Sequence, residues 1–306
     1  MAPRITTGGE ADGPTMASNH TTAAPRKDPM LPSYLDDPAL ASVALVATDM
    51  DCTLLADDGT LPPDFNQLIA SMENAGIVFC AASGRPCYTL REMFADHLDT
   101  IALMSDNGAA IAYRGEIIYK SLMEPKDVDE LLGFTLEDGR GCPTVCSLDA
   151  CYIRACDRVH DGYFRKFFST IRYVDTLDGI DAEVNKYTVY FPERNAEEVF
   201  ADAYRDAWGA RFHVTNAGRE WIDVMNRGIN KGSGIERLCE HLGISTADAA
   251  AFGDTFNDIQ MLEAAGHGFV VANAEEHMHA HANYLAPSNN DRGVSTVIEA
   301  MLAARR

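Results

Sequence analysis

Short apolar segments that alternate with amphipathic segments constrain the fold of this 306-residue chain more than any other feature. The segments expected to form strands lie at about residues 43–49, 77–82, 100–105, 248–253 and 268–272. The segments expected to form helices lie at about residues 64–75, 86–96, 232–242 and 257–265. Strands and helices that alternate in this way are typical of a doubly wound parallel sheet. We therefore predict an α/β fold.

A long segment between the third and fourth expected strands has a pattern of its own. We expect a helix from about residue 122, a strand pair at 144–154, a strand at 187–191, a helix at 196–208, and strands at 212–215 and 221–225. This segment is too long for a crossover connection and predicts a second, α+β domain. We assign residues 37–121 and 227–306 to the core, residues 122–226 to the insertion, and residues 1–36 to a disordered extension.

Two aspartates end the first apolar segment. Asp49 and Asp51 follow the run 43–47 and can face one pocket, because residues two apart point to the same side of a strand. Carboxylates at the end of a buried strand are costly unless a cation and a reaction use them. Most Asp-x-Asp pairs are solvated turn residues, and for this pair alone that interpretation stays open.

Three further motifs follow an apolar segment or begin a helix. Residues Ser83–Pro86 place a hydroxyl and a glycine at a helix start, which suits a phosphate. Residues Asn230–Gly232 place the ammonium group of Lys231 at another helix start. Residues Gly253–Asp258 add a second acidic cluster after a strand. Carboxylates, a hydroxyl and an ammonium group together indicate phosphoryl transfer.

These motifs, in their order and spacing over residues 43–304, resemble the haloacid dehalogenase (HAD) superfamily of phosphohydrolases. Within it they resemble the Cof-like branch, class IIB, which carries a large C2-type cap domain. Residues Asn107–Ala109, Ala272–Ala274 and Asp291–Val294 are also similar to that branch. The resemblance implies a Rossmann-like core, a cap over the active site, an aspartyl-phosphate intermediate and Mg²⁺ as cofactor.

The resemblance implies a role for each motif. Asp49 is the expected nucleophile, Asp51 the general acid and base, and Lys231 the third catalytic residue. Mg²⁺ is expected on the carboxylates of Asp49 and Asp254, on the carbonyl of Asp51, and on Asp258 directly or through water. The expected phosphate- or substrate-binding residues are Ser83, Gly84, Arg85, Asn107, Lys231 and Asn257.

Several of these residues also have a purely structural interpretation. A lysine near a helix start is usually solvated, although Lys231 there is unfavourable against the helix dipole unless an anion lies nearby. Ser83 could act only as a helix N-cap, and Arg85 only in a structural ion pair. Asn107 begins an Asn-Gly pair, which is a common turn signal.

Cys52 departs from the pattern, because this branch usually has glycine at that position. Glycine is preferred where φ is positive or where another backbone comes close. Cysteine is small and fits there if φ is negative, and we expect it to be a tolerated structural substitution. The alternative is a nucleophilic or redox-active thiol, but Asp49 already fills the first role and no partner cysteine is adjacent.

Two other groups of residues have the side chains, but not the spacing, of metal sites. The four cysteines between residues 142 and 156 lack paired Cys-x-x-Cys motifs, so we expect partly buried thiols in a reducing compartment rather than zinc ligands. His277 and His281 share a helix face without a second cluster, and we expect that face to be exposed.

Composition limits the partners. The net charge is −21, which disfavours nucleic acid and anionic membranes. No apolar run is long enough for a membrane span or a signal sequence, so we expect a cytoplasmic protein, monomeric or weakly homo-oligomeric. Met16 and Met30 leave the start site open.

The predicted function is a Mg²⁺-dependent phosphomonoesterase that acts on a small phosphorylated metabolite. Sugar phosphates are expected first, and pyridoxal phosphate or a flavin mononucleotide next. The insertion should set specificity, although its polar candidates, Lys186, Arg219 and Glu220, are each expected at the surface. A phosphosugar mutase of the same fold and a non-catalytic binding protein are the alternatives.

Overall fold

A computed structural model describes residues 31–305 of the chain. Residues 1–30 lie outside the described residues. They make up most of the segment predicted to be disordered, residues 1–36, and include both alternative start sites. The last part of that prediction is wrong. Residues Tyr34–Asp36 form a 3-10 turn, and the Tyr34 ring packs edge-on against Phe269 with 5.8 Å between ring centroids. Through this contact the segment buries apolar surface of Tyr34 against the core.

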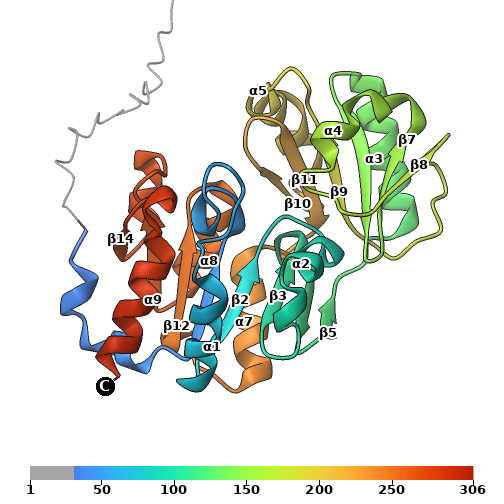
Figure 1. The fold of residues 1–306 in the computed structure, drawn as a ribbon. Coiled ribbons are helices and arrows are strands. Elements are labelled where there is room, and N and C mark those ends of the chain that lie inside the picture. The colour runs from blue at the N-terminus through green and yellow to red at the C-terminus, as the bar shows by residue number, and fades with distance from the viewer. Residues whose placement is uncertain (1–30, 306) are drawn as a thin grey trace, which may run out of the picture. The chain divides into compact units, whose positions relative to one another are not determined.

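An eight-stranded sheet forms the core, in the order β14-β13-β12-β1-β2-β3-β4-β5 (Figure 1). Its strands are β1 (Leu45–Thr48), β2 (Val78–Ala82), β3 (Ala102–Ser105), β4 (Ala110–Tyr113), β5 (Glu116–Lys120), β12 (Ala249–Gly253), β13 (His267–Val271) and β14 (Tyr284–Ala286). The six strands from β14 to β3 are parallel, which confirms the predicted sheet, whereas the unpredicted β4 and β5 add an antiparallel edge.

Helices cover both faces of this sheet, because successive strand side chains point to opposite sides. In β1, Val46 packs into one apolar cluster with helices α1, α2 and α9, while Leu45 and Ala47 pack into another with α7 and α8. These helices are α1 (Phe65–Asn74), α2 (Cys87–Met93), α7 (Lys231–Leu242), α8 (Ile259–Ala264) and α9 (Gly293–Ala304). The four helices predicted for the core are confirmed.

Strand β1 lies between β2 and β12, so the chain turns in opposite directions on its two sides. Ligands of open α/β sheets bind beyond the carboxyl ends of the strands at such a switch point. Asp49 follows β1 and Asp254 follows β12, while Ser83 follows β2 and Asp106 follows β3. The topology therefore gathers the polar motifs at one edge of the sheet.

A six-stranded sheet, in the order β10-β11-β9-β6-β7-β8, lies between residues 142 and 226. Its strands are β6 (Cys142–Ser147), β7 (Cys151–Arg154), β8 (Ile171–Val174), β9 (Val184–Tyr190), β10 (Phe212–Asn216) and β11 (Trp221–Asn226). Its helices are α3 (Pro125–Asp138), α4 (Asp161–Phe164), and α5 (Ala196–Val199) and α6 (Arg205–Trp208), which one π-helical turn joins. We call residues 122–226 the insert; the domain boundaries stay a prediction.

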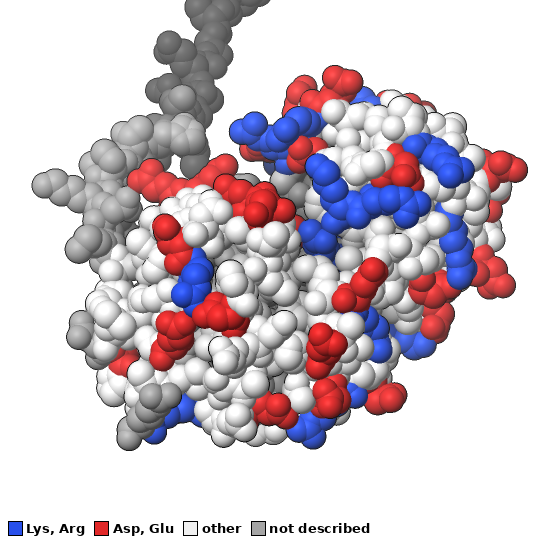
Figure 2. All heavy atoms as spheres, in the orientation of Figure 1, with Lys and Arg blue, Asp and Glu red and all other residues white. Residues whose placement is uncertain are grey.

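The insert has its own apolar core, in which Tyr187 and Tyr204 are fully buried. Strand β8 and helix α4 were not predicted. Acidic side chains are scattered over the visible surface, whereas Lys and Arg gather mainly on the surface of the insert (Figure 2). Among the described residues, no helix has the length and apolar character needed to cross a membrane.

Candidate active site

Lys231 lies fully buried between two aspartates. Its Nζ donates to Asp49 Oδ1 and, at 2.5 Å, to Asp258 Oδ1. The start of α7 fixes this position, because Asn230 caps the helix by accepting a hydrogen bond from the Ser233 N–H at 2.8 Å. Although burial opposes it, the two carboxylates raise the pKa of Lys231. The structure therefore contradicts a solvated surface position for Lys231.

Three carboxylates meet beside this lysine. Ligand oxygens of Asp49, Asp254 and Asp258 all lie within 4.8 Å of one another. Burial raises the pKa of Asp49 well above its ordinary value, against the opposing effect of Lys231. Burial also raises the pKa of Asp254 to about 7, and the carboxylate of Asp258 adds to the rise. In both cases the charged form of the carboxyl group is disfavoured in the metal-free protein, and a bound cation would stabilise it.

The two oxygens of Asp258 are already used. Oδ1 accepts from Lys231, and Oδ2 accepts from the backbone N–H groups of Asp254 at 3.0 Å and Thr255 at 3.2 Å. Asp254 Oδ1 in turn accepts from the Thr53 hydroxyl at 3.0 Å. Asp258 thus holds Lys231 and the turn that carries Asp254.

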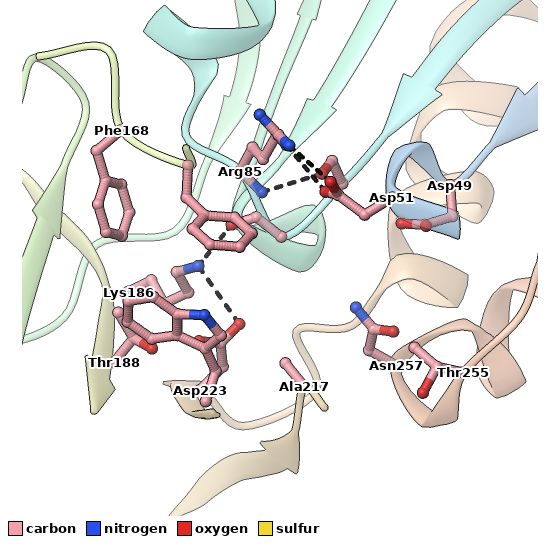
Figure 3. A pocket seen from close by; sticks show the side chains of 14 residues that line it. Asp49, Asp51, Arg85, Phe168, Lys186, Thr188, Ala217, Asp223, Thr255 and Asn257 are labelled. Carbon is pink, nitrogen blue, oxygen red and sulfur yellow. Dashed lines mark hydrogen bonds and ion pairs between the residues drawn. The ribbon is translucent and has the colours of Figure 1, made fainter. Parts of the chain in front are cut away.

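Asp51 forms a bidentate ion pair with Arg85 (Figure 3). Arg85 Nε lies 2.9 Å from Asp51 Oδ2 and Nη2 lies 2.6 Å from Oδ1. The same guanidinium donates through Nη1 to the Lys166 carbonyl of the insert at 2.8 Å. Arg85 therefore has the ion-pair contact that sequence reasoning left open, and its partner is the expected general acid.

Backbone and amide contacts hold the residues that are expected to bind phosphate. The Ser83 hydroxyl accepts from the Arg85 N–H at 3.1 Å, so it does brace the turn. Asn107 accepts from Asn257 Nδ2 at 2.9 Å and donates to Asp223 Oδ2 at 2.7 Å. Ser83, Asn107 and Asn257 are all buried. Gly84 lines the cavity described below.

The expectation that Lys186 lies at the surface is wrong. Lys186 is 3% exposed, and its Nζ donates to the Gly84 carbonyl at 2.5 Å and to Asp223 Oδ2 at 3.3 Å. Asp106 Oδ1 lies 3.6 Å away, and both carboxylates raise the pKa of Lys186 against the effect of burial. Arg219 is exposed and Glu220 pairs with Arg194, so neither lines the cavity.

Asp106 and Asp223 were not predicted from the sequence. A signal was present for Asp223 and Lys186, since each is a charged residue inside a run of strand-forming residues. A charge in a buried strand needs a partner or a function. Their partners, however, come from segments that are remote in the sequence.

A cavity of about 130 Å³ joins the core motifs to the insert. Its lining from the core comprises Asp49, Asp51, Ser83, Gly84, Arg85, Thr255 and Asn257. Its lining from the insert comprises Phe167, Phe168, Lys186, Thr188, Ala217, Trp221 and Asp223. Figure 3 shows that labelled residues of both groups face this space. The cavity therefore places Asp49 and Asp51 next to any ligand that the insert binds.

Cys52 adopts a positive φ of 60°, so the condition of a negative φ, under which cysteine would fit easily, is not met. The Cys52 carbonyl accepts from Asn273 Nδ2 at 2.7 Å, and the Leu55 N–H donates to the Met50 carbonyl at 2.8 Å, so the turn is held from both sides. Burial, with nearby carboxylates, raises the pKa of the thiol to about 11. The thiol therefore stays protonated at neutral pH and is a weak nucleophile.

The remaining cysteines and histidines have local contacts. All eight cysteines are free thiols, and three of the four between residues 142 and 156 are buried. The His277 ring stacks on Phe256 with 4.5 Å between centroids, and His281 Nδ1 lies 2.7 Å from Glu263 Oε1. Among residues 31–305, the aspartate cluster is the group of three whose geometry could hold a metal ion.

Comparisons with known proteins point to one family. A sequence profile of the haloacid dehalogenase-like hydrolases matches residues 46–298. The chain is 28% identical, over 85% of its length and 97% of the relative's, to the 5-amino-6-(5-phospho-D-ribitylamino)uracil phosphatase YbjI of Escherichia coli K12. Its fold is similar to that of SMU.1108c from Streptococcus mutans UA159, with TM-score 0.80, 27% identity and coverage of 85% and 99%. It is also similar to the HAD subclass IIB sugar phosphatase BT4131, with TM-score 0.71, 23% identity and coverage of 84% and 98%.

Proposed function

Because the chain belongs to the haloacid dehalogenase-like hydrolases, in the Cof-like branch, and is a phosphatase of phosphorylated small molecules, we propose that it is a Mg²⁺-dependent phosphomonoesterase with Asp49 as nucleophile. The observation that carries the proposal is the group of Asp49, Lys231, Asp254 and Asp258 at the switch point of the sheet, in which Asp254 is half-buried and the other three are buried. A protein that only bound phosphate would not need a carboxylate facing that anion.

In the first step, an Asp49 oxygen attacks phosphorus and the ester bond to the leaving alcohol breaks. Asp51 gives its proton to the leaving oxygen. In the second step, water attacks the aspartyl phosphate, Asp51 takes up the proton, and inorganic phosphate leaves with Asp49 regenerated. Both Asp51 oxygens accept hydrogen bonds from Arg85, so each proton transfer requires one of these bonds to open.

Positive charge and donors would hold the phosphoryl group in both steps. Lys231 lies against Asp49 and supplies an ammonium group to the equatorial oxygens. The Ser83 hydroxyl, which only accepts a hydrogen bond from Arg85, has its own proton free to donate to phosphate. Arg85 and Asn107 are the further contacts that we assign to the substrate.

The residues present fit a hard divalent cation. The three carboxylates, of which Asp49 and Asp254 have a raised pKa, form the oxygen-rich donor set that Mg²⁺ prefers. Asp49, Asp254 and the Asp51 carbonyl would hold the ion, and Asp258, whose oxygens are both engaged, would orient the site. Bound Mg²⁺ would neutralise charge on the transferred phosphoryl group.

Sugar phosphates were the first substrate class predicted from the sequence. The name of the Escherichia coli relative instead combines a phosphoribityl group with a uracil ring. We propose a small phosphorylated metabolite of the cytoplasm as the substrate. A phosphosugar mutase is the alternative, and it would return an isomer of the sugar phosphate instead of free phosphate.

The test is a screen of phosphorylated metabolites for released phosphate, with Mg²⁺ or with EDTA. We expect hydrolysis that EDTA abolishes and that Asp49→Asn lowers by several powers of ten, each corresponding to about 1.4 kcal/mol of barrier. Activity that persists in EDTA or in Asp49→Asn would contradict the proposal. An isomeric sugar phosphate as main product would support the mutase.

A further inference from the structure

Aromatic side chains from the insert form one wall of the active-site cavity. Phe167, Phe168 and Trp221 all line it, and Phe167 and Phe168 lie edge-on to the Trp221 indole with ring centroids 5.6 and 5.8 Å away. Phe168 and Trp221 are nearly buried, at 3% and 8% exposure, so the wall is packed in place. Phe167 is only half-buried and offers ring surface to a ligand.

Packing behind the wall fixes its orientation. The Trp221 ring lies against Tyr190, with 5.1 Å between ring centroids, and is stacked with Tyr163 at 6.0 Å. Aromatic rings held in this way can pack against a planar ring of a ligand with little loss of side-chain freedom.

The polar groups near this wall are already engaged within the protein. Lys186 donates to the Gly84 carbonyl and to Asp223 Oδ2, and the Thr188 hydroxyl donates to the Ile222 carbonyl at 3.1 Å. A ligand rich in hydroxyl groups would therefore find few free donors beside the aromatic wall. Among the described residues, the hydrogen bonds to the Asp223 carboxylate, from Asn107 and Lys186, both go to Oδ2, which leaves Oδ1 as an acceptor for a ring N–H or amino group.

The aromatic wall and the expected nucleophile share the cavity. Asp49 and Asp51 line the same space as Phe167 and Trp221, and the Arg85 guanidinium that holds Asp51 lies 5.4 Å from the centroid of the Phe167 ring. A substrate whose phosphate reaches Asp49 would therefore place its leaving group against the wall. The cavity volume of about 130 Å³ is close to the ~150 Å³ that holds a benzene ring in an apolar cavity.

We propose that the leaving group contains a single planar heteroaromatic ring, which Phe167 and Trp221 bind by aromatic contact, in preference to a sugar. This inference rests on the proposed phosphatase function and narrows its substrate class. It assigns Phe167 and Trp221 as specificity-determining residues. It also predicts that a fused three-ring group fits less well than one ring.

The test compares kcat/KM for pyridoxal phosphate, flavin mononucleotide, glucose phosphate and glycerol phosphate, with Mg²⁺ present. We expect pyridoxal phosphate to exceed each of the others by at least about tenfold, or about 1.4 kcal/mol. Phe167→Leu should lower the ratio of kcat/KM for pyridoxal phosphate to that for glycerol phosphate by about tenfold, within the range measured for stacking on aromatic side chains.

Phe134→Leu is the matched control, because Phe134 is also a half-buried phenylalanine of the insert but packs against Tyr204 and Trp208 instead of lining the cavity. It should leave the ratio unchanged. Trp221→Leu with Trp208→Leu as control is a second pair, with urea unfolding to verify that each variant folds.

The outcomes separate the inference from the function on which it rests. Equal or better turnover of glucose phosphate, or a ratio that falls as much in Phe134→Leu as in Phe167→Leu, overturns the aromatic preference while the phosphatase stands. Flavin mononucleotide as the best substrate overturns the single-ring limit. No hydrolysis of any ester overturns the proposed function, and the inference with it.

Discussion

Replacing Cys52 with glycine should make the protein more stable. Cys52 has φ 60° and ψ 7°, in the left-handed region where the side chain of an L-residue is strained. The turn holds it there through the hydrogen bond from Asn273 to its carbonyl and the Leu55–Met50 backbone bond. Strain at such a position persists only because the surroundings determine the backbone conformation.

The magnitude follows from two opposing terms. A left-handed conformation costs an L-residue roughly 1–2 kcal/mol, and glycine avoids this cost. Glycine loses more backbone freedom on folding, which offsets about 0.5–1 kcal/mol of the gain. Cys52 is exposed to solvent over much of its surface although its thiol is partly shielded, so little packing is lost. We expect a net gain of roughly 0.5–1 kcal/mol in the free energy of unfolding.

Urea unfolding of the wild type, Cys52→Gly and Cys52→Ala measures this gain. Alanine is the matched control, because it removes the thiol but keeps the Cβ that causes the strain. Cys52→Ala should stay close to the wild type, and both variants should keep turnover within roughly tenfold. A glycine variant no more stable than the alanine variant would refute the strain, and a thousandfold loss of turnover in folded Cys52→Ala would show that the thiol takes part in the chemistry.

In the metal-free protein, the raised pKa of Asp254 means that the folded state binds this proton more tightly than the unfolded chain. Its contribution to stability should therefore be present below about pH 4 and be lost as the pH rises to about 7. The measurement is the difference in unfolding free energy between the wild type and Asp254→Asn, and a difference that stays constant over this pH range would contradict the prediction. Lys231→Met should destabilise by roughly 3–5 kcal/mol in urea unfolding, because two buried carboxylates lose their ammonium partner. Lys120→Met, at an exposed ion pair, should cost under about 1 kcal/mol, and equal losses would refute the burial argument. Gly253→Ala should destabilise by about 1–3 kcal/mol and weaken Mg²⁺ binding in calorimetry, because its Cβ would lie 2.4 Å from the Asp258 Cβ; unchanged binding would contradict this.

The parallel core could be predicted because its strands are buried on both faces. Such strands are continuous apolar runs, as in β1 and β12, and the polar motifs stand out where the runs end. Strand β14 has only three residues, and the hairpin of β4 and β5 is short and lies at the edge, so neither gives a periodic signal of useful length. The antiparallel edge was therefore missed.

The contacts between core and insert could not be predicted in the same way. Asn107 meets Asp223 across 116 positions of the chain, and Lys186 meets the Gly84 carbonyl across 102. Strand alternation gives the face on which a side chain lies but not what that face will meet. The glycine usual at the position of Cys52 was a signal for a positive φ, whereas the hydrogen bond from the distant Asn273 that holds the turn is not encoded in the local sequence.

Detection of a phosphoryl group on Asp49 would show directly that this carboxylate is the nucleophile. The enzyme is mixed with Mg²⁺ and a phosphate ester that it hydrolyses in the screen. The reaction is quenched in acid within one turnover, and the protein is digested for peptide mass spectrometry. We predict one phosphoryl group on the peptide that contains Asp49, absent from Asp49→Asn and lost as free phosphate forms. Phosphate release without a phosphorylated enzyme, or with the group on another residue, would contradict it.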